Sequence, residues 1–429
     1  GSPLIDRGAT QQSLSQLDVN SIERVEIVEG PMSVVYGTDA LAGVINIITK
    51  KGDGYSEENT WRVGARVQEE SMGKEYDFFK DKGLHNESID LGFNHKSGLF
   101  VNGGYTRNNH GGWQGDLTGR EKRWHPKDQA LMNGMFGFQN RNMNVWYRLD
   151  FLDEKIFGPN NGSELQPEKV SDKDFLTKRY THQLQSDWKL DNRLDVHAAL
   201  SYQDYKRRTR TTESDLSTGE KWLSSAEASQ DITQYKAWIA RATVAWNIAP
   251  EFSVQPGVEY QWTQGEGGRI DGTPKVSDLA FFLSAEYKPW EWLSLRPGVR
   301  TFIVADYDAP IAIPSVLTKF KLTKHMDLRL SYAYGFRSPT LQELYFSFHN
   351  DNHDIDGNPD LKAEYSHNIT GSVAYRVLHS EKIHLTTTLS GFYNDFRDKI
   401  SLAQNVDIPN YNTYYNIDRY KTVGGSLEN

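Results

Sequence analysis

The feature that most restricts the fold of this 429-residue chain is a repeated alternation of apolar and polar residues from Trp61 onward. In the first such segment Trp61, Val63 and Val67 share one face, while Arg62 and Arg66 share the other. A strand that alternates in this way contacts an apolar environment on one side and water on the other. Alternation over about ten residues, repeated many times, is typical of a transmembrane β-barrel with a lipid-facing exterior and a polar lumen. Further segments of this kind begin near residues 89, 99, 143, 194, 238, 252, 279, 326 and 383.

The connections between these segments alternate in length. Short turns are predicted near residues 96–98, 140–142, 190–192, 249–251, 289–290, 323–325 and 380–381. Long polar connections are predicted at residues 69–86, 108–129, 153–179, 207–233, 264–276, 307–314, 337–363 and 395–411. Short turns at one end and long loops at the other are expected of an outer-membrane barrel, whereas a soluble β-sandwich shows Greek-key spacing. The pattern gives about sixteen strands, with the start of another at Thr422.

The composition excludes several other classes of protein. The net charge of −9 disfavours a nucleic-acid-binding protein, which usually carries a basic face. The absence of cysteine excludes a disulfide framework and a thiolate metal site. No apolar run has the length of a membrane-spanning helix, and Gly1-Ser2-Pro3 does not begin a signal peptide. No nucleophile elbow, phosphate-binding loop or zinc-binding helix motif is found, so the sequence predicts no enzyme.

The densest apolar stretch, residues 22–52, precedes the alternating segments. Residues 22–29 alternate as a half-buried strand, and Gly30-Pro31 ends it because proline cannot donate to a β-ladder. Pro31 suits a first helical position, so residues 32–36 are predicted to form one helical turn that Gly37 stops. Residues 44–49 are a β-branched run, which predicts a buried strand.

The sequence of this stretch, IERVEIVEGPMSVVYGTDALAGVINIITK, closely resembles the end of the plug domain of TonB-dependent outer-membrane receptors. The sequence departs from the family pattern at Glu29, where many members carry a basic residue, and at Ala42, where glycine is usual. These departures concern local charge pairing. The matching plug-motif positions include Arg24, Glu26, Gly30, Pro31, Tyr36, Gly37, Gly43 and Asn46.

The resemblance implies an all-β transmembrane antiparallel barrel, of a family with about 22 strands, around an α/β plug. We expect residues 1–52 to be the C-terminal part of the plug, 53–58 a linker and 59–429 a partial barrel of about 16–17 strands. The chain would then lack the first part of the plug and the last barrel strands. The plug should meet the barrel wall through polar contacts, since both carry charges such as Arg24, Glu26, Arg148 and Arg241.

The same resemblance implies a Gram-negative outer-membrane protein surrounded by lipid. It would import a scarce ligand using energy from the TonB–ExbB–ExbD complex. A surface lipoprotein or a host haemoprotein is a further partner to consider, and nucleic acid is not. A soluble, β-rich carbohydrate-binding protein, with its 22 Tyr and 11 Trp as sugar platforms, is the alternative of a different class.

Residues 335–364 form the most informative outer loop. Phe336, Arg337 and Pro339 resemble the F-R-A-P box of haem and haemoglobin receptors, with Ser338 in place of the usual alanine. Asn358, Pro359 and Leu361 resemble the N-P-x-L box of the same receptors, which place a haem-ligating histidine between the two boxes.

Four residues of this loop are therefore candidate ligand-binding residues: Arg337, Tyr345, His349 and His353. Imidazole and tyrosinate can hold haem iron, so His349 and His353 are the candidate iron ligands. Being four residues apart, they would lie on one side of a helix if this loop were helical. Haem is thus the expected cargo.

Other interpretations of the loop stay open. The two boxes also occur in siderophore and cobalamin receptors, so cobalamin or a ferric siderophore is the alternative cargo. Asp351, Asp354 and Asp356 surround the histidines, and such acidic loops are either solvated or bind calcium. No cofactor is required for transport itself. The other outer-loop histidines, His85, His110 and His125, are expected to be incidental.

Overall fold

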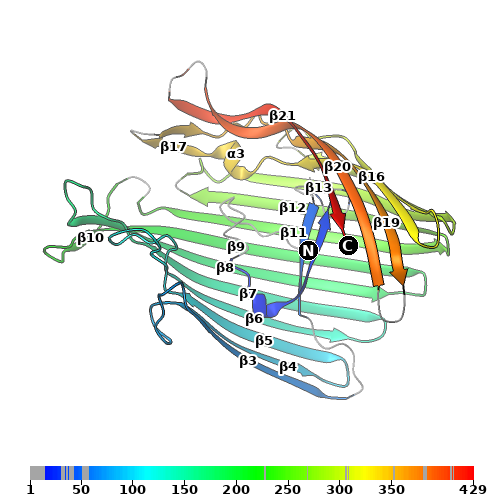
Figure 1. Cartoon of the computed structure of the whole chain (residues 1–429), viewed down its shortest axis with the longest axis horizontal. Coiled ribbons are helices and arrows are strands. Elements are labelled where there is room, and N and C mark those ends of the chain that lie inside the picture. The colour runs from blue at the N-terminus through cyan, green and yellow to red at the C-terminus, as the bar shows by residue number, and fades with distance from the viewer. Residues whose placement is uncertain are drawn as a thin grey trace.

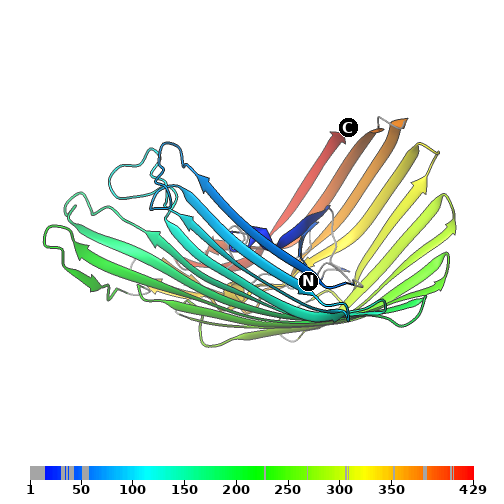
Figure 2. The ribbon, with the colours of Figure 1, turned by 90° about the horizontal axis from the view of Figure 1, so that it is seen from below.

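The computed structural model describes residues 15–29, 34, 37, 43–50, 58–226, 229–267, 269–304, 307, 309–350, 353–379, 384–405, 408 and 410–429. In these parts of the chain, sixteen long strands form one curved antiparallel wall: seven in β3–β9, six in β11–β16 and three in β19–β21. Each long strand pairs with its neighbour along the chain, and the wall curves around two short strands near the N-terminus (Figures 1 and 2). This is the predicted barrel architecture.

The first half of the wall runs from β3 to β9 with registers that shift nowhere. Its strands are β3 (Thr60–Glu70), β4 (Leu84–Asn94), β5 (Leu99–His110), β6 (Lys127–Gln139), β7 (Met143–Gly158), β8 (Lys169–Lys189) and β9 (Leu194–Asp215). A short strand, β10 (Lys221–Leu223), folds back on the end of β9.

The second half continues from β11 to β21. Its strands are β11 (Ile232–Ala249), β12 (Phe252–Gly267), β13 (Lys275–Trp290), β14 (Leu293–Val304), β15 (Ile313–Lys321), β16 (Met326–Arg337), β19 (Glu364–His379), β20 (His384–Gln404) and β21 (Tyr411–Glu428). Between β16 and β19 lie the helix α3 (Leu341–Tyr345) and the hairpin of β17 (Ser347–Asn350) and β18 (His353–Asp356).

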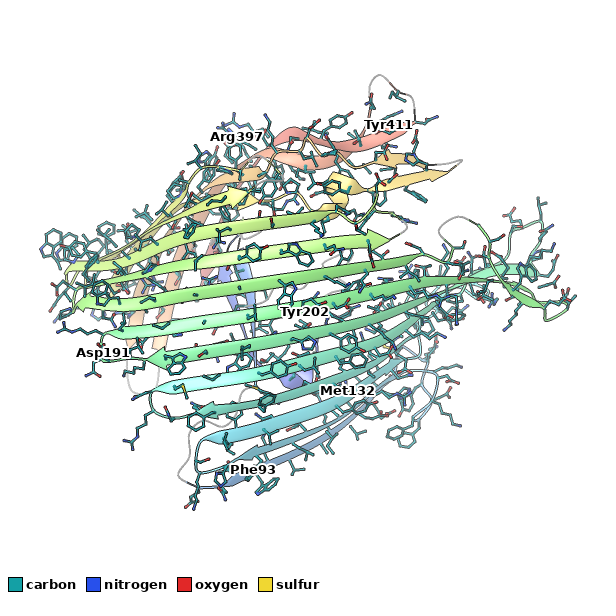
Figure 3. The ribbon with its side chains drawn as sticks, turned by 180° about the vertical axis from the view of Figure 1, so that it is seen from behind. Phe93, Met132, Asp191, Tyr202, Arg397 and Tyr411 are labelled. Carbon is teal, nitrogen blue, oxygen red and sulfur yellow. The ribbon has the colours of Figure 1, made fainter. Side chains whose placement is uncertain are left out.

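The apolar rows predicted to face lipid are exposed on the outside of the wall. Trp61 and Val63 are 77% and 71% exposed, and Leu91, Leu200 and Phe281 are exposed in the same way. Their neighbours on the other face include polar residues such as Arg62 and Asp90, although Ala280 and Phe282 beside Phe281 are apolar and buried. The exposed rows themselves do not pack into an internal sandwich core. Figure 3 views this outer surface, where Phe93, Met132 and Tyr202 lie on successive parts of the wall.

Helical membrane spans are a separate matter. Within the described ranges, no helix is both long enough and apolar enough to cross a membrane.

The N-terminal part forms a small two-stranded unit inside the wall. A 3-10 turn, η1 (Val19–Ser21), leads into β1 (Ile22–Glu29), which pairs antiparallel with β2 (Gly43–Thr49). Both predicted strands are therefore present, but residues 44–49 are not the buried strand expected, since Ile45 is 57% exposed. Of the predicted helical turn at residues 32–36, Val34 is described and is helical; Gly30, Pro31 and Tyr36 lie outside the described residues.

Several predicted loops are shorter than expected because the strands continue past the membrane. The predicted loop 153–179 is largely the end of β7 and the start of β8, and β9 continues through Asp215 into the predicted loop 207–233. Likewise, β20 and β21 occupy most of residues 395–411, so the last strand starts at Tyr411 and not near Thr422. Charged cross-strand pairs replace apolar alternation there, which is why a hydrophobicity pattern does not detect these extensions.

Candidate functional site

The first candidate site is the contact between the N-terminal unit and the wall. The Gln16 side chain donates a hydrogen bond to Glu154 Oε1 over 2.8 Å, and Arg179 donates to both Gln16 Oε1 and the Gln16 carbonyl. Gln129 joins the group by donating to the Ser15 carbonyl and to Glu154. All four side chains of this cluster (Gln16, Gln129, Glu154, Arg179) are buried, so the contact is polar and closely packed.

A second group of polar contacts lies beside η1. Thr106 donates to Asp18 Oδ1, Asn20 donates to Thr106, and Arg66 donates to the Asn20 amide oxygen. Burial raises the pKa of Asp18, although the hydrogen bond from Thr106 opposes this shift. A small polar cavity adjoins these residues and is also lined by Arg62. The prediction that the plug–wall contact is polar is therefore confirmed for this part of the chain.

Further along the N-terminal unit, Gly37 contacts a buried charge cluster of the wall. Glu259 accepts hydrogen bonds from Arg300 over 2.6 Å and from Arg241 over 3.0 Å. Gly37 has φ +92°, and a Cβ there would lie 3.0 Å from Glu259 Oε1 and 3.4 Å from Arg300 Nη2. Glycine is thus required both by the backbone conformation and by the closeness of the charged wall.

Val34 anchors the same region through apolar packing. It is 3% exposed and belongs to a cluster with Ile313, Phe336 and Ala363. The apolar face predicted for residues 326–336 placed Phe336 among the lipid-facing residues, and that placement is wrong. Phe336 is fully buried against this cluster, because the N-terminal unit supplies an apolar partner that the strand pattern cannot reveal.

The predicted plug charges have local partners. Arg24 pairs with Glu23 and Glu26, and Glu26 also accepts a hydrogen bond from Asn46 of β2. Of the predicted wall charges, Arg148 binds Asp150 on its own strand, and Arg241 binds Glu259. The contact residues Gln16, Glu154 and Arg179 were not predicted. Glu154 and Arg179 lie in a stretch that was predicted to be an outer loop. Only the structure shows that β7 and β8 continue through these positions and that both side chains point into the lumen.

The second candidate site is the outer loop between β16 and β19. Arg337 ends β16 and binds two carboxylates with both ends of its guanidinium group, Glu343 of α3 and Glu364 at the start of β19. Thr340 and Glu343 form a reciprocal capping box that begins α3. Glu364 also accepts from the Ile400 backbone N–H, so Arg337 connects the helix to three strands. The guanidinium group of Arg337, which was predicted to bind the ligand, therefore already binds two carboxylates of the loop.

The second box also holds the loop together. Asn358 donates through its side chain to the Tyr414 carbonyl and through its backbone to the Glu343 carbonyl. Leu361 is 2% exposed and packs with Leu344 and Ile400. Pro339 is buried and Pro359 is exposed. Both boxes therefore fix the base of the loop against β20 and β21.

The candidate iron ligands lie on a β-hairpin and not on a helix. Asn350 pairs with His353 across the hairpin, and His349 pairs with Asp354, so the two histidines do not share a helical face as expected. The helix of this loop, α3, ends at Tyr345, before either histidine. A hairpin forms because β18 adds in parallel to β21, which gives the segment a backbone partner. The His353 side chain lies outside the described atoms.

His349 is exposed and is surrounded by acceptors. Its Nδ1 lies 2.6 Å from Asp354 Oδ1, and its Nε2 lies 3.1 Å from Asp356 Oδ1 and 3.0 Å from Ser347 Oγ. Tyr411 donates its hydroxyl to the other oxygen of Asp356. The hydrogen bond to Asp354, together with both carboxylate charges, raises the pKa of His349 above its usual value.

The chemistry available to this hairpin is that of one imidazole held by a carboxylate. An Nδ1–H donated to a carboxylate is common behind metal-bound histidines. In this structure the Nε2 atom, which would be the coordinating nitrogen, lies against Asp356 and Ser347. Tyr345 packs partly buried beside Leu341 and Leu344 and does not reach His349 through any described hydrogen bond. The described residues contain no group of three or more His, Cys, Asp or Glu arranged to hold a metal ion.

Two family models match the chain. Residues 1–44 match the TonB-dependent receptor plug domain, and residues 230–429 match the TonB-dependent receptor-like β-barrel. The iron-regulated outer membrane virulence protein of Vibrio cholerae serotype O1 is 26% identical over 403 residues, which cover 89% of this chain and 54% of that protein. The chain thus spans about half the length of this curated relative.

A shorter match and a solved structure extend the comparison. A haemoglobin and haemoglobin-haptoglobin-binding protein of Haemophilus influenzae is 38% identical over 82 residues, 19% of this chain and 7% of that protein. The crystal structure of the siderophore receptor PirA from Pseudomonas aeruginosa superposes with a TM-score of 0.70 at 15% identity, over 95% of this chain and 69% of that one. At this identity the likeness establishes the fold.

Proposed function

We propose that this protein, which belongs to the TonB-dependent receptors of the Gram-negative outer membrane, imports an iron-containing ligand with energy supplied through TonB. The family consists of receptors and transporters and not of enzymes, in agreement with the sequence prediction. The expected division into a plug segment at 1–52, a linker at 53–58 and a barrel from 59 onward is part of the proposal. TonB–ExbB–ExbD is the proposed energy source.

The observation that carries this proposal is the polar contact between the N-terminal unit and the wall. Gln16, Asp18 and Asn20 are held by hydrogen bonds from wall residues, and each such bond contributes about 0.5–1.5 kcal/mol net. Water can replace polar contacts one at a time without exposing a large apolar surface. Such a plug is held in place at rest and can be displaced by a pull from the periplasmic side.

Growth under iron limitation tests the proposed activity. A strain that lacks the gene receives the full-length gene and is supplied with haemin or a ferric catecholate siderophore, each in the presence and absence of TonB. Cobalamin is tested separately, in a background whose growth requires cobalamin. We expect rescue by an iron-containing ligand only when TonB is present. Rescue that is independent of TonB, or none with any ligand, contradicts the proposal.

Haem is the proposed cargo. The support is the position of His349 on an outer-loop hairpin, with Asp354 holding Nδ1 at 2.6 Å. To bind iron, Nε2 would exchange its present contacts with Asp356 and Ser347 for the metal. The partial similarity to a haemoglobin-binding protein agrees with this choice. A ferric siderophore is the second candidate, because the solved siderophore receptor shares the fold over nearly the whole chain.

Haemin titration of the full-length protein separates these cargoes. His349→Ala and His353→Ala should each be compared with His110→Ala, which removes a histidine at the end of β5. We expect the Soret shift and affinity to fall in at least one of the first two variants and to persist in the third. Identical Soret spectra in all variants and the wild type would remove both histidines from the site and favour the siderophore.

A further inference from the structure

The outer parts of β7, β8 and β9 carry cations on the face that points away from the lumen. Glu154 and Arg179 contact Gln16 of the N-terminal unit, so their side chains face inward. Side chains alternate between the two faces of a strand. Lys155 and Lys178, next to these two residues, therefore lie on the exterior face.

The same parity applies to β9. Tyr205 and Arg207 are 1% and 5% exposed and face inward, whereas Lys206 and Arg208 are exposed on the outside. Four cations on three adjacent strands, which we call the exterior basic patch, thus share one surface: Lys155, Lys178, Lys206 and Arg208.

The patch lies just beyond the outer aromatic belt of the barrel. The rings of Tyr180 and Phe151 lie with their centroids 4.8 Å apart, and those of Tyr202 and Trp238 with their centroids 4.5 Å apart. Figure 3 shows Tyr202 on the outer surface, well away from the short turn that contains Asp191. Lys178 is two residues beyond Tyr180 on β8, and two residues add about 7 Å along a strand.

The inner aromatic belt fixes the membrane thickness and supports this placement. Trp188 lies eight residues from Tyr180 on β8, in the direction of the short turns. Eight residues span about 27 Å along a strand, or roughly 20 Å across a membrane when the strand is tilted as barrel strands are. This is close to the apolar band of an outer-membrane barrel, so the patch lies at the level of the lipid headgroups.

The register places like charges beside each other. Lys178 is directly opposite Lys206 on the neighbouring strand, and Leu176 is directly opposite both Lys155 and Arg208. Directly opposed like charges destabilise a sheet. Asp153 lies opposite Lys178 on its other side, and Asp204 shares the exterior face two residues from Lys206, so these carboxylates offset part of the repulsion. A bound anion would offset the rest.

The protein neutralises only part of this charge. Lys178 lies 3.6 Å from Asp153, and Lys155 lies 3.2 Å from Asp174, which is also bound by Arg210. Among the described residues, no ion pair is formed by Lys206 or Arg208. The exterior basic patch therefore keeps a positive surplus at the membrane surface.

We propose that the exterior basic patch binds the phosphate groups of a phosphorylated lipid in the outer leaflet. Clusters of Lys and Arg at a membrane surface attract anionic headgroups, and arginine also binds phosphate through two hydrogen bonds. The apolar rows below Tyr180 and Tyr202 contact the acyl chains of the same molecule. This combination of surfaces selects a lipid over free phosphate.

Native mass spectrometry of the full-length protein in detergent tests the proposal. The probes are bis-phosphorylated lipid A, the same lipid without its phosphates, and inorganic phosphate. We expect wild-type protein to retain the phosphorylated lipid and the Lys206→Gln/Arg208→Gln variant to bind it roughly 30-fold more weakly, from two surface charges removed. The Lys288→Gln/Arg296→Gln variant is the control for removing two charges elsewhere, because these exposed cations lie near the short-turn end of the wall and pair with Glu286, which shares the inward face of Phe282.

Three results would overturn the proposal. They are equal retention of lipid by the patch variant and the wild type, equal retention of the phosphorylated and phosphate-free lipids, and full competition by inorganic phosphate at the same phosphate concentration. Heat-induced unfolding of each variant, followed by circular dichroism in the same detergent, verifies that the patch variant is folded. The measurement does not depend on transport, so its failure is separate from failure of the proposed import function.

Discussion

Arg179 of the barrel wall binds Gln16 of the N-terminal unit through two hydrogen bonds, one to its side-chain oxygen and one to its main-chain carbonyl. The Gln16 amide in turn donates to Glu154, so one glutamine is held between a buried cation and a buried anion. The Gln16 amide can bind both charges because it carries a donor and an acceptor. The two hydrogen-bonding partners fix the position of the N-terminal unit on the wall, and water can replace each of these bonds.

Removing the guanidinium group should loosen this contact. In Arg179→Ala, Gln16 loses both hydrogen bonds and Glu154 loses a nearby cation, at a cost of about 1.5–3 kcal/mol. Hydrogen–deuterium exchange of full-length protein should show faster exchange for residues 15–21, with the strands of the wall unchanged. Arg107→Ala is the control, because its pair with Asp128 is exposed and worth about 0–1 kcal/mol. Equal exchange in the two variants would contradict a special role for Arg179.

Gly37 gives a sharper test of how closely the plug packs on the wall. Gly37→Ala introduces a Cβ 3.0 Å from Glu259 Oε1 at φ +92°, so both steric contact and backbone strain oppose it. The strain alone costs about 1–3 kcal/mol. Gly219→Ala provides the comparison, since Gly219 has φ +79° but a Cβ there meets nothing within 4 Å.

The expected difference is a loss of plug protection in Gly37→Ala that is absent in Gly219→Ala. Protease accessibility of the N-terminal unit in the folded barrel would measure it. Protease accessibility of the N-terminal unit equal to that of the wild type in Gly37→Ala would show that neither strain nor the contact with Glu259 restricts this position.

The sequence predicts the wall well because alternation has one cause, lipid on one side and water on the other. The rows at Trp61 and Val63 follow directly from it. The pattern does not predict Phe336 correctly, since its ring lies against Phe302 and Tyr307 in an apolar cluster that also contains Val34 of the N-terminal unit. The pattern also fails for the parts of the strands outside the membrane. There the orientation of side chains such as Glu154 and Arg179 depends on polar partners and not on hydrophobicity.

The outer loop shows the same limit. The two boxes are recognisable in sequence, but their role here comes from contacts distant in the chain, such as that of Asn358 with Tyr414. The helical spacing expected for His349 and His353 is wrong because β21 offers a strand edge for β18. A local sequence window contains no information about that edge.

Arg337 should be essential for the geometry of this loop. In Arg337→Ala, Glu343 and Glu364 are left side by side without a cation, which costs about 1.5–3 kcal/mol for bonds to a charged group. Arg337→Lys should restore only part of this, since a single ammonium group cannot bind both carboxylates in two-pronged fashion. Exchange protection of α3 and of the hairpin β17–β18 reports the result. Unchanged protection in Arg337→Ala would show that the capping box and apolar packing suffice.

The His349 hairpin should respond to pH. Its folded-state pKa is raised, first by the hydrogen bond to Asp354 and then by the charge of Asp356, so the protonated imidazole stabilises the hairpin. For a group with a raised pKa, this stabilisation is fully present below the unfolded value near 6.5 and is lost as the pH rises through the higher folded value. The groups that face His349 are Asp354, Asp356 and Ser347, with Tyr411 donating to Asp356 from β21. After correction for intrinsic rates, amide exchange in β17 and β18 should therefore be slower at pH 6 than at pH 8 in the wild type, and the difference should disappear in His349→Gln. A pH difference of the same size in that variant would assign the effect to another group.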